Sequence, residues 1–387
     1  MGKSYRGKHV LILEGYARQC LPFMQSFKKH GCEITLLCGS KLDLGYWSRL
    51  PDHKIVGICD PDRYEASRDY ICDLIRKGHY DLVVPLVDFS ARILSEHKEE
   101  LSRYSRIASN DADVFAVAQD KLAVMKVCME NDIPCPKTLT GICSYGDIPE
   151  NALAYPIVVK PRKDCGAKGF HCFATSEEFA AFSGDAALDD FVVQEYIPQS
   201  NRNLSVSLFI DNDGNVKSAY TYAGRRWFPL AGGTGTLNEL VERRDAVEPC
   251  QKLADLLHLK GSVGFDLIDD PRDGMVKVIE INPRILACAK IGFVGGIDQA
   301  LMILQKEFGQ EVMPQTTLNK KVYIRMTQTD VLWFLKSPDR WKAEPSWFRI
   351  RNTHDQTFSW RDPLPWLAFL IRGMTKLRGE LEERNAT

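Results

Sequence analysis

Gly264-Phe265-Asp266-Leu267-Ile268 and Val278-Ile279-Glu280-Ile281-Asn282-Pro283-Arg284 are the two stretches that decide the fold of this chain. Both are mainly apolar and have the length of a β-strand. Between them, residues 269–274 are rich in Asp, Pro and Gly, which are typical of turns. Two strand-like runs joined by turn residues predict a β-hairpin.

One face of this hairpin is predicted to carry polar side chains. Side chains alternate along a strand, so Val278, Glu280 and Asn282 should share a face, with Asp266 opposite them. Carboxylate and amide oxygens are the hard ligands that Mg²⁺ takes beside nucleotide phosphates. Arg284 would lie further along, where it can neutralise charge on a transferring phosphoryl group. A solvated polar face is the alternative, but a carboxylate among apolar residues is costly without a partner.

The order Asp266, Glu280, Asn282 and Arg284 resembles the metal-binding end of the ATP-grasp superfamily of carboxylate–amine ligases. It is most similar to the carbamoyl-phosphate synthase large subunit and biotin carboxylase. The resemblance implies ATP and Mg²⁺, with Mn²⁺ as an alternative, and makes Asp266, Glu280 and Asn282 the metal ligands. Arg284 becomes a candidate catalytic residue.

Composition sets the limits for the rest of the chain. The 387 residues (43.8 kDa) are 44% hydrophobic and 26% charged, which is typical of a globular protein of two or three domains. A formal net charge of −1 gives no electrostatic case for nucleic acid. No signal peptide and no membrane span is expected, and the twelve scattered cysteines are expected to be free thiols in the cytoplasm.

The N-terminal part alternates strand-like and helix-like patterns. The strand-like runs include residues 9–13, 33–37 and 82–86. Such alternation predicts a doubly wound parallel sheet. The loop after the first run lacks the G-x-G-x-x-G motif of a dinucleotide site. Gly15, Arg18 and Asp88 follow strand ends, where they would either touch a substrate or serve as ordinary loop residues.

Residues 111–132 are predicted to form one helix with Asp111 as its N-cap. The segment around Asp120-Lys121 resembles the exit from the N-terminal domain of ATP-grasp proteins, and Lys121 is carried over as a nucleotide-binding residue. The proline-rich stretch that follows is a natural boundary.

A lysine and a glycine-containing loop are the predicted phosphate-binding elements. Lys160 ends the apolar run 156–159, and its ammonium suits phosphate oxygens. The loop that follows supplies Gly166, Lys168 and Gly169. Glycines let backbone N–H groups approach phosphates closely. The resemblance assigns all four residues to the nucleotide phosphates.

Residues 191–198 resemble the hinge at which ATP-grasp proteins bind adenine. The positions carried over are Gln194, Glu195, Tyr196 and Ile197. Similar proteins follow the hinge with an acidic residue for the ribose hydroxyls. Here Asn203 takes that place, because an amide can also hydrogen-bond hydroxyls.

Arg225 and Arg226 precede a second glycine-rich loop, residues 231–236. In similar ligases this segment lines the acceptor side of the active site, and both arginines are predicted to bind a substrate carboxylate or the developing acyl phosphate. The alternative is a surface basic pair next to a mobile loop.

The last part of the chain differs from the rest in composition, because five of the seven tryptophans follow residue 330. An apolar stretch with a basic flank, residues 362–378, would either lie on a membrane surface or pack on its own domain. This tail resembles those of ATP-grasp proteins in bacterial surface-polysaccharide synthesis.

Together these features predict an α/β protein in three parts. Residues 1–112 form a doubly wound domain. Residues 113–315 form a two-lobed α+β ATP-grasp domain, with a lid lobe at about 134–196 and a larger lobe at about 197–315, and residues 316–387 form a tryptophan-rich extension. The expected activity couples a small-molecule carboxylate to an amine, and a phosphotransferase or a non-catalytic nucleotide-binding module are the alternatives. A homodimer, a location at the inner face of the membrane and a contact of the tail with a membrane or glycan assembly stay open.

Overall fold

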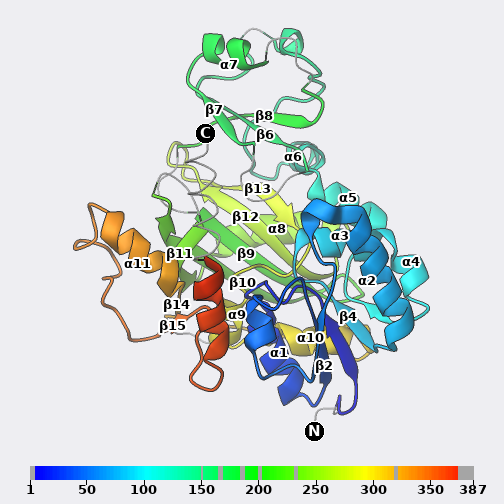
Figure 1. Ribbon diagram of the computed structural model, residues 1–387. Coiled ribbons are helices and arrows are strands. Elements are labelled where there is room, and N and C mark those ends of the chain that lie inside the picture. Colours follow the sequence, from blue (N-terminus) through cyan, green and yellow to red (C-terminus); the bar gives the residue numbers. More distant parts are fainter. Residues whose placement is uncertain are drawn as a thin grey trace, which may run out of the picture.

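The computed structural model describes residues 5–149, 151–163, 169–183, 188–198, 203–230, 234–317 and 321–373. Its strands form three sheets, of five, seven and three strands. In Figure 1 the five-stranded sheet lies at the bottom, the seven-stranded sheet in the centre and the three-stranded sheet at the top. None of the helices in the described ranges has both the length and the apolar character needed to cross a membrane.

The N-terminal sheet is parallel throughout, with strand order β3-β2-β1-β4-β5. Its strands are β1 (His9–Ile12), β2 (Glu33–Cys38), β3 (His53–Val56), β4 (Leu82–Val84) and β5 (Arg106–Ile107). The helices between them are α1 (Cys20–Lys29), α2 (Tyr64–Gly78), α3 (Asp88–Glu96) and α4 (Lys98–Leu101). This order confirms the predicted doubly wound α/β fold.

Alternation along β1 explains why helices cover both faces of this sheet. Val10 and Ile12 belong to the same apolar cluster as Phe23 of α1. Leu11 points the other way, into a cluster with Ile71 of α2. Successive side chains of a strand face opposite sides, so a strand that is apolar on both sides needs two helical layers.

The three-stranded sheet forms a small lobe with antiparallel order β7-β6-β8. Its elements are β6 (Ile157–Pro161), β7 (His171–Phe173), α7 (Ser176–Ser183) and β8 (Phe191–Glu195). Phe173 and Phe179 pack on Val159 in a separate core. This lobe therefore has its own apolar centre, apart from the rest of the molecule.

The central sheet has the order β13-β12-β9-β10-β11-β14-β15. The strands are β9 (Asn203–Ile210), β10 (Val216–Phe228), β11 (Thr234–Val241), β12 (Gly261–Asp269), β13 (Val276–Asn282), β14 (Tyr323–Arg325) and β15 (Thr353–Asp355). Helix α8 (Arg244–Leu256) shares a cluster with one face of the sheet. Helices α9 (Lys290–Gly295) and α10 (Gln299–Glu307) share the cluster that also contains α1, and the rings of Phe23 and Phe293 are 5.1 Å apart.

Two helices replace the single helix predicted for residues 111–132. Helix α5 (Ala112–Gln119) ends at Asp120, and α6 (Lys121–Glu130) begins after it. The Asp120 carboxylate accepts hydrogen bonds from the backbone N–H groups of Leu122 and Ala123, at 3.0 and 3.2 Å. It therefore caps α6, since such bonds satisfy N–H groups that start a helix. Asp111 precedes α5, as expected, but its carboxylate pairs with Lys98 instead of capping.

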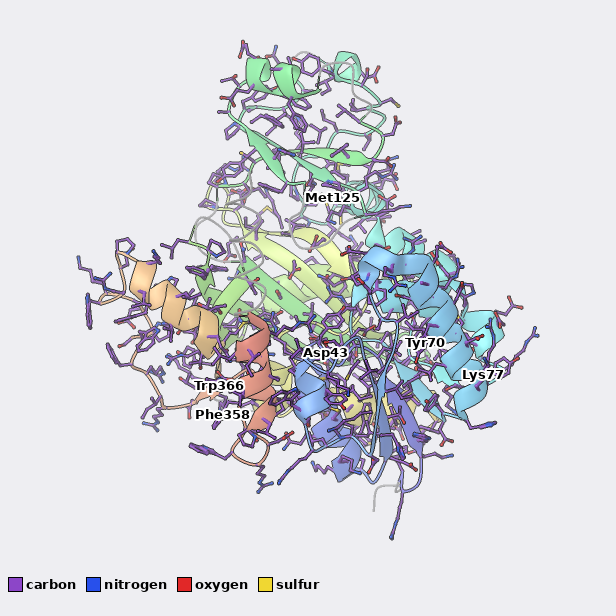
Figure 2. The ribbon with its side chains drawn as sticks, in the orientation of Figure 1. Asp43, Tyr70, Lys77, Met125, Phe358 and Trp366 are labelled. Carbon is purple, nitrogen blue, oxygen red and sulfur yellow. The ribbon has the colours of Figure 1, made fainter. Side chains whose placement is uncertain are left out.

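The described part of the C-terminal extension packs on the same chain. Strands β14 and β15 extend the central sheet, and α11 (Thr327–Lys336) carries Asp330, which is fully buried. Arg372 forms an ion pair with Asp43 of the N-terminal part at 2.7 Å. Figure 2 shows Asp43 near the helix of residues 364–373, which carries Trp366, and Phe358 lies on the segment before that helix.

Asp330 is predicted to be a main stabilising residue of this arrangement. Asp330→Ala would leave the buried Arg226 and its neighbour Arg325 without their counter-charge. Removal of one partner from a buried ion pair costs about 3–5 kcal/mol. Urea denaturation should show a loss of this size, whereas Asp339→Ala, at an exposed position after the same helix, should unfold like the parent. Equal stability of the two variants would contradict the assignment.

Candidate active site

The predicted hairpin is confirmed by the pairing of β12 with β13. Asp266 lies directly opposite Glu280, and Gly264 lies opposite Asn282. The register then shifts, so that Leu267 pairs with Val278 and one extra residue is left in β13. Such a bulge reverses the side-chain alternation. Val278 therefore belongs to the core with Ile281, and the expectation that it shares a face with Glu280 is wrong.

Two lysines reach this hairpin from other elements. The bulge lies at Ile279, whose carbonyl oxygen accepts a 3.4 Å hydrogen bond from Nζ of Lys160 on β6. Nζ of Lys121, the first residue of α6, is 3.5 Å from Oε2 of Glu280. Burial lowers the pKa of Lys160 to about 8, and nearby Lys121 adds to this effect while Glu280 opposes it. The two ammonium groups thus lie beside the carboxylate face.

Asp266 is held by neighbours on both sides. Ser205 donates to its Oδ1 at 2.6 Å and the Asn282 amide donates to its Oδ2 at 2.9 Å. Burial and the charge of Glu280 raise the pKa of Asp266 to about 7, against the opposing effect of those hydrogen bonds. Ser205 is not among the predicted site residues, although the alternation of Ser205 and Ser207 along β9 indicates polar residues on this face.

These donors fit a divalent cation. A cation would relieve the repulsion between Asp266 and Glu280, and all their oxygens are hard ligands. In the described ranges, no group of three or more His, Cys, Asp and Glu side chains could hold a metal alone. Mg²⁺ commonly uses one or two carboxylates and completes its shell with substrate phosphates and water. Two carboxylates and the Asn282 amide match this usual set of protein ligands for Mg²⁺.

Arg284 links the hairpin to the N-terminal sheet. Its Nη2 donates to Oδ2 of Asp88 at 2.6 Å and to Oδ1 of Asn282 at 2.9 Å. Its Nε is buried and makes no hydrogen bond within the described residues. The ion pair fixes Arg284 beside the metal candidates and brings the end of β4 to the same place.

The two adjacent arginines of β10 are separated by the strand alternation. Arg225 is partly exposed and donates to Glu239 at 2.7 Å. Arg226 is only 2% exposed and donates to both carboxylate oxygens of Asp330, at 2.8 and 2.9 Å. Its Nη1 also donates to the carbonyl oxygen of Pro345. The prediction that Arg226 binds a substrate carboxylate is therefore wrong, because its donors are used in a buried ion pair.

The predicted adenine-binding segment connects the two lobes. The Gln194 amide is buried and donates to Thr138 at 2.7 Å, so it is used within the small lobe. Glu195 accepts from the backbone of Lys137 and from Arg272 of the hairpin turn. These contacts tie the segment to both lobes.

The other residues predicted to contact the nucleotide lie in different surroundings. The N–H of Tyr196 donates to Pro156, and Ile197 is buried. Asn203 is exposed at the start of β9. Gly169 has a φ of +67°, which favours glycine. Gly166 and Lys168 lie outside the described residues. Nucleotide binding by these six residues stays a prediction.

Comparison with known proteins gives both sequence and structural similarity. Residues 118–288 match the family model of the ATP-grasp domain. A D-aspartate ligase from Enterococcus faecium is 24% identical over an alignment of 255 residues, which covers 61% of this chain and 61% of that protein. The chain thus spans less than two thirds of the length of this relative.

Solved structures show the same fold. Biotin carboxylase from Campylobacter jejuni superposes with a TM-score of 0.65 at 16% identity, over 81% of this chain and 74% of that chain. The L-amino acid ligase from Bacillus licheniformis gives 0.62 at 16% identity, over 83% and 80%. At such identities the likeness concerns the fold alone. The family match and the shared fold agree with the predicted resemblance: residues 118–288 of this chain form an ATP-grasp domain.

Proposed function

We propose that the chain is an ATP-dependent ligase that couples a carboxylate to an amine. The observation that carries the proposal is the pair Asp266 and Glu280, opposed on neighbouring strands with Lys121 and Lys160 beside them. This combination of anionic and cationic groups suits a nucleotide with its cation. The D-aspartate ligase and the L-amino acid ligase found by comparison support an amino acid as the acid substrate.

The reaction needs two bond exchanges. A carboxylate oxygen of the acid attacks the γ-phosphorus of ATP, the bond to the β-phosphate oxygen breaks and ADP leaves. The amine nitrogen then attacks the acyl carbon, phosphate leaves and the amine proton is released. The protein acts by placing the reactants and by neutralising charge, as is usual in phosphoryl transfer.

Each proposed residue has one task in this scheme. Lys121 and Lys160 hold the phosphates, and Arg284 stabilises charge that develops during transfer. Asp266, Glu280 and Asn282 would hold Mg²⁺, or Mn²⁺ as the alternative, which supplies positive charge to the phosphate oxygens when bound. Arg225 would contact the acceptor side.

The first test is a screen for phosphate release from ATP. The protein is incubated with D-aspartate and a panel of other amino acids and sugar acids, each with and without an amine. Amide formation supports the ligase. A stable phosphate ester would identify a phosphotransferase instead, and nucleotide binding without turnover a non-catalytic module. A role in cell-envelope or surface-polysaccharide synthesis and the three domain boundaries stay predictions.

Glu280→Gln and Asp266→Asn are each expected to abolish ATP turnover and to leave the fold intact, because each removes one negative charge from the proposed metal ligands. The measurement is phosphate release at several Mg²⁺ concentrations, with circular dichroism to check folding. Glu248→Gln, on the exposed side of α8, is the matched control and should behave like the parent. Full activity of Glu280→Gln at ordinary Mg²⁺ concentration would overturn the metal assignment.

Lys160 is expected to take up a proton when ATP binds. Its pKa is lowered to about 8 in the free protein, mainly by burial. A phosphate partner favours the charged form and raises this pKa, so binding at about pH 8.5 should be accompanied by proton uptake that is nearly absent at about pH 6.5. Titration calorimetry in two buffers of different ionisation enthalpy measures the uptake.

The variants decide whether this proton belongs to Lys160. Lys160→Met should remove the uptake and weaken ATP binding, whereas Lys163→Met, at an exposed position three residues later, should retain both. Unchanged ATP affinity in Lys160→Met would mean that Lys160 has only a structural role.

Arg284→Ala is expected to lower kcat by roughly 10²–10³-fold while changing the KM for ATP much less, since it removes a donor that acts on charge formed during transfer. Steady-state kinetics with each substrate varied separately gives both constants. A change in the KM for ATP alone would make Arg284 a nucleotide-binding residue.

A further inference from the structure

Arg18 occupies a special position in the N-terminal sheet. It lies on the loop between β1 and α1, and β1 is paired with β2 on one side and β4 on the other. In a doubly wound sheet the connections diverge at such a point, and ligands bind beyond the carboxyl ends of its strands.

The loop that carries Arg18 is fixed by its neighbours. The backbone N–H of Leu86 donates to Oε2 of Glu14 at 2.9 Å, and the Gln19 amide donates to the carbonyl oxygen of Leu86 at 2.7 Å. Glu14 and Gln19 are both buried. Arg18 is therefore presented from a rigid support between the ends of β1 and β4.

Among the described residues, the guanidinium of Arg18 has no carboxylate as counter-charge. Its Nη1 contacts the Met326 sulfur at 3.2 Å. The titratable groups that act on it are the Cys288 thiol and the Tyr222 hydroxyl, and burial raises the pKa of both, so both are neutral at pH 7. Burial lowers the pKa of Arg18 itself, and no carboxylate among the described residues pairs with it.

Three other arginines with largely covered side chains differ from Arg18 in this respect. Arg226 and Arg325 share Asp330, and Arg284 has Asp88. A cation that is partly withdrawn from water without a partner is unfavourable. Because no described carboxylate pairs with Arg18, we expect a ligand to supply the negative charge.

A row of paired residues connects Arg18 with the proposed metal ligands. Tyr222 of β10 lies opposite Ser205 of β9, Ser205 lies opposite Asp266 of β12, and Asp266 lies opposite Glu280 of β13. Directly paired residues share a face of the sheet, and neighbouring strands are about 4.8 Å apart. Tyr222, which acts on Arg18, thus lies two strand spacings, roughly 10 Å, from Asp266, beside which phosphoryl transfer is proposed.

We infer that Arg18 binds a second carboxylate of the acid substrate, so that the substrate class is a small dicarboxylic acid. One carboxylate would react beside Asp266 and Glu280, and the other would pair with Arg18. This inference rests on the proposed ligase function, because only that function requires an acid at this place. A guanidinium suits the task, since its planar donors match a carboxylate.

The test measures acid binding and stability, independently of turnover. D-aspartate, L-aspartate and succinate are the dicarboxylate probes, and D-alanine is the monocarboxylate probe. Binding is followed by titration calorimetry and by the shift in Tm, with and without MgADP. Arg18→Met, Arg18→Lys and the exposed control Arg103→Met are compared with the parent.

The parent is expected to bind at least one dicarboxylate more tightly than D-alanine. Arg18→Met should weaken this binding by about tenfold or more, the loss typical of a charge-assisted hydrogen bond, while Arg18→Lys weakens it less and Arg103→Met leaves it unchanged. MgADP affinity should stay the same in all variants. Without ligand, Arg18→Met should be at least as stable as the parent, because an unpaired charge has been removed.

Several results would overturn the inference. These are parental dicarboxylate affinity in Arg18→Met, no dicarboxylate binding by the parent, and a lower Tm of ligand-free Arg18→Met, which would indicate a structural role. Failure of the ligase proposal looks different, because the parent would then release no phosphate from ATP although Arg18 still determined dicarboxylate binding.

Discussion

The repulsion between Asp266 and Glu280 is the constraint on which the rest of the site depends. Two carboxylates on directly opposed strand positions are unfavourable together, and burial together with the charge of Glu280 raises the pKa of Asp266. Ser205 and the Asn282 amide offset part of it by donating to Asp266. A divalent cation would offset the rest of the repulsion between the two carboxylates. A pair that is unfavourable alone can therefore serve as a cation-binding pair in a nucleotide site.

Three separate parts of the chain converge on this pair. Helix α6 brings Lys121 to Glu280, the small lobe brings Lys160 to the bulge at Ile279, and the N-terminal sheet brings Asp88 to Arg284. The bulge matters because it redirects the side chains of β13 next to the carboxylates, a common use of bulges beside active sites. The carboxylate face therefore depends on contacts from every sheet of the molecule.

The sequence predictions that the structure confirms rest on local sequence patterns. The hairpin and the parallel sheet follow from alternation and turn residues within short windows. The place of Lys160 near the end of a strand follows from the same kind of window, and its role in nucleotide binding stays a prediction. The errors concern partners that are distant in sequence. Nothing near Arg226 in the sequence indicates that it is buried, because its partner Asp330 is distant in sequence. The apolar pattern of β13 likewise does not indicate the bulge beside Asp266. The break at Asp120 was missed because its neighbours are good helix formers.

The burial of Asp330 also sets an order of events during synthesis of the chain. Arg226 is synthesised 104 residues before Asp330. Strand β14, which pairs with β11, is also synthesised well after β11, and β15 follows it. Until then the central sheet has an open edge at β11 and an arginine without its partner, both of which favour association with other chains. The lobe that holds the nucleotide site can therefore reach its final packing only when almost the whole chain has been made.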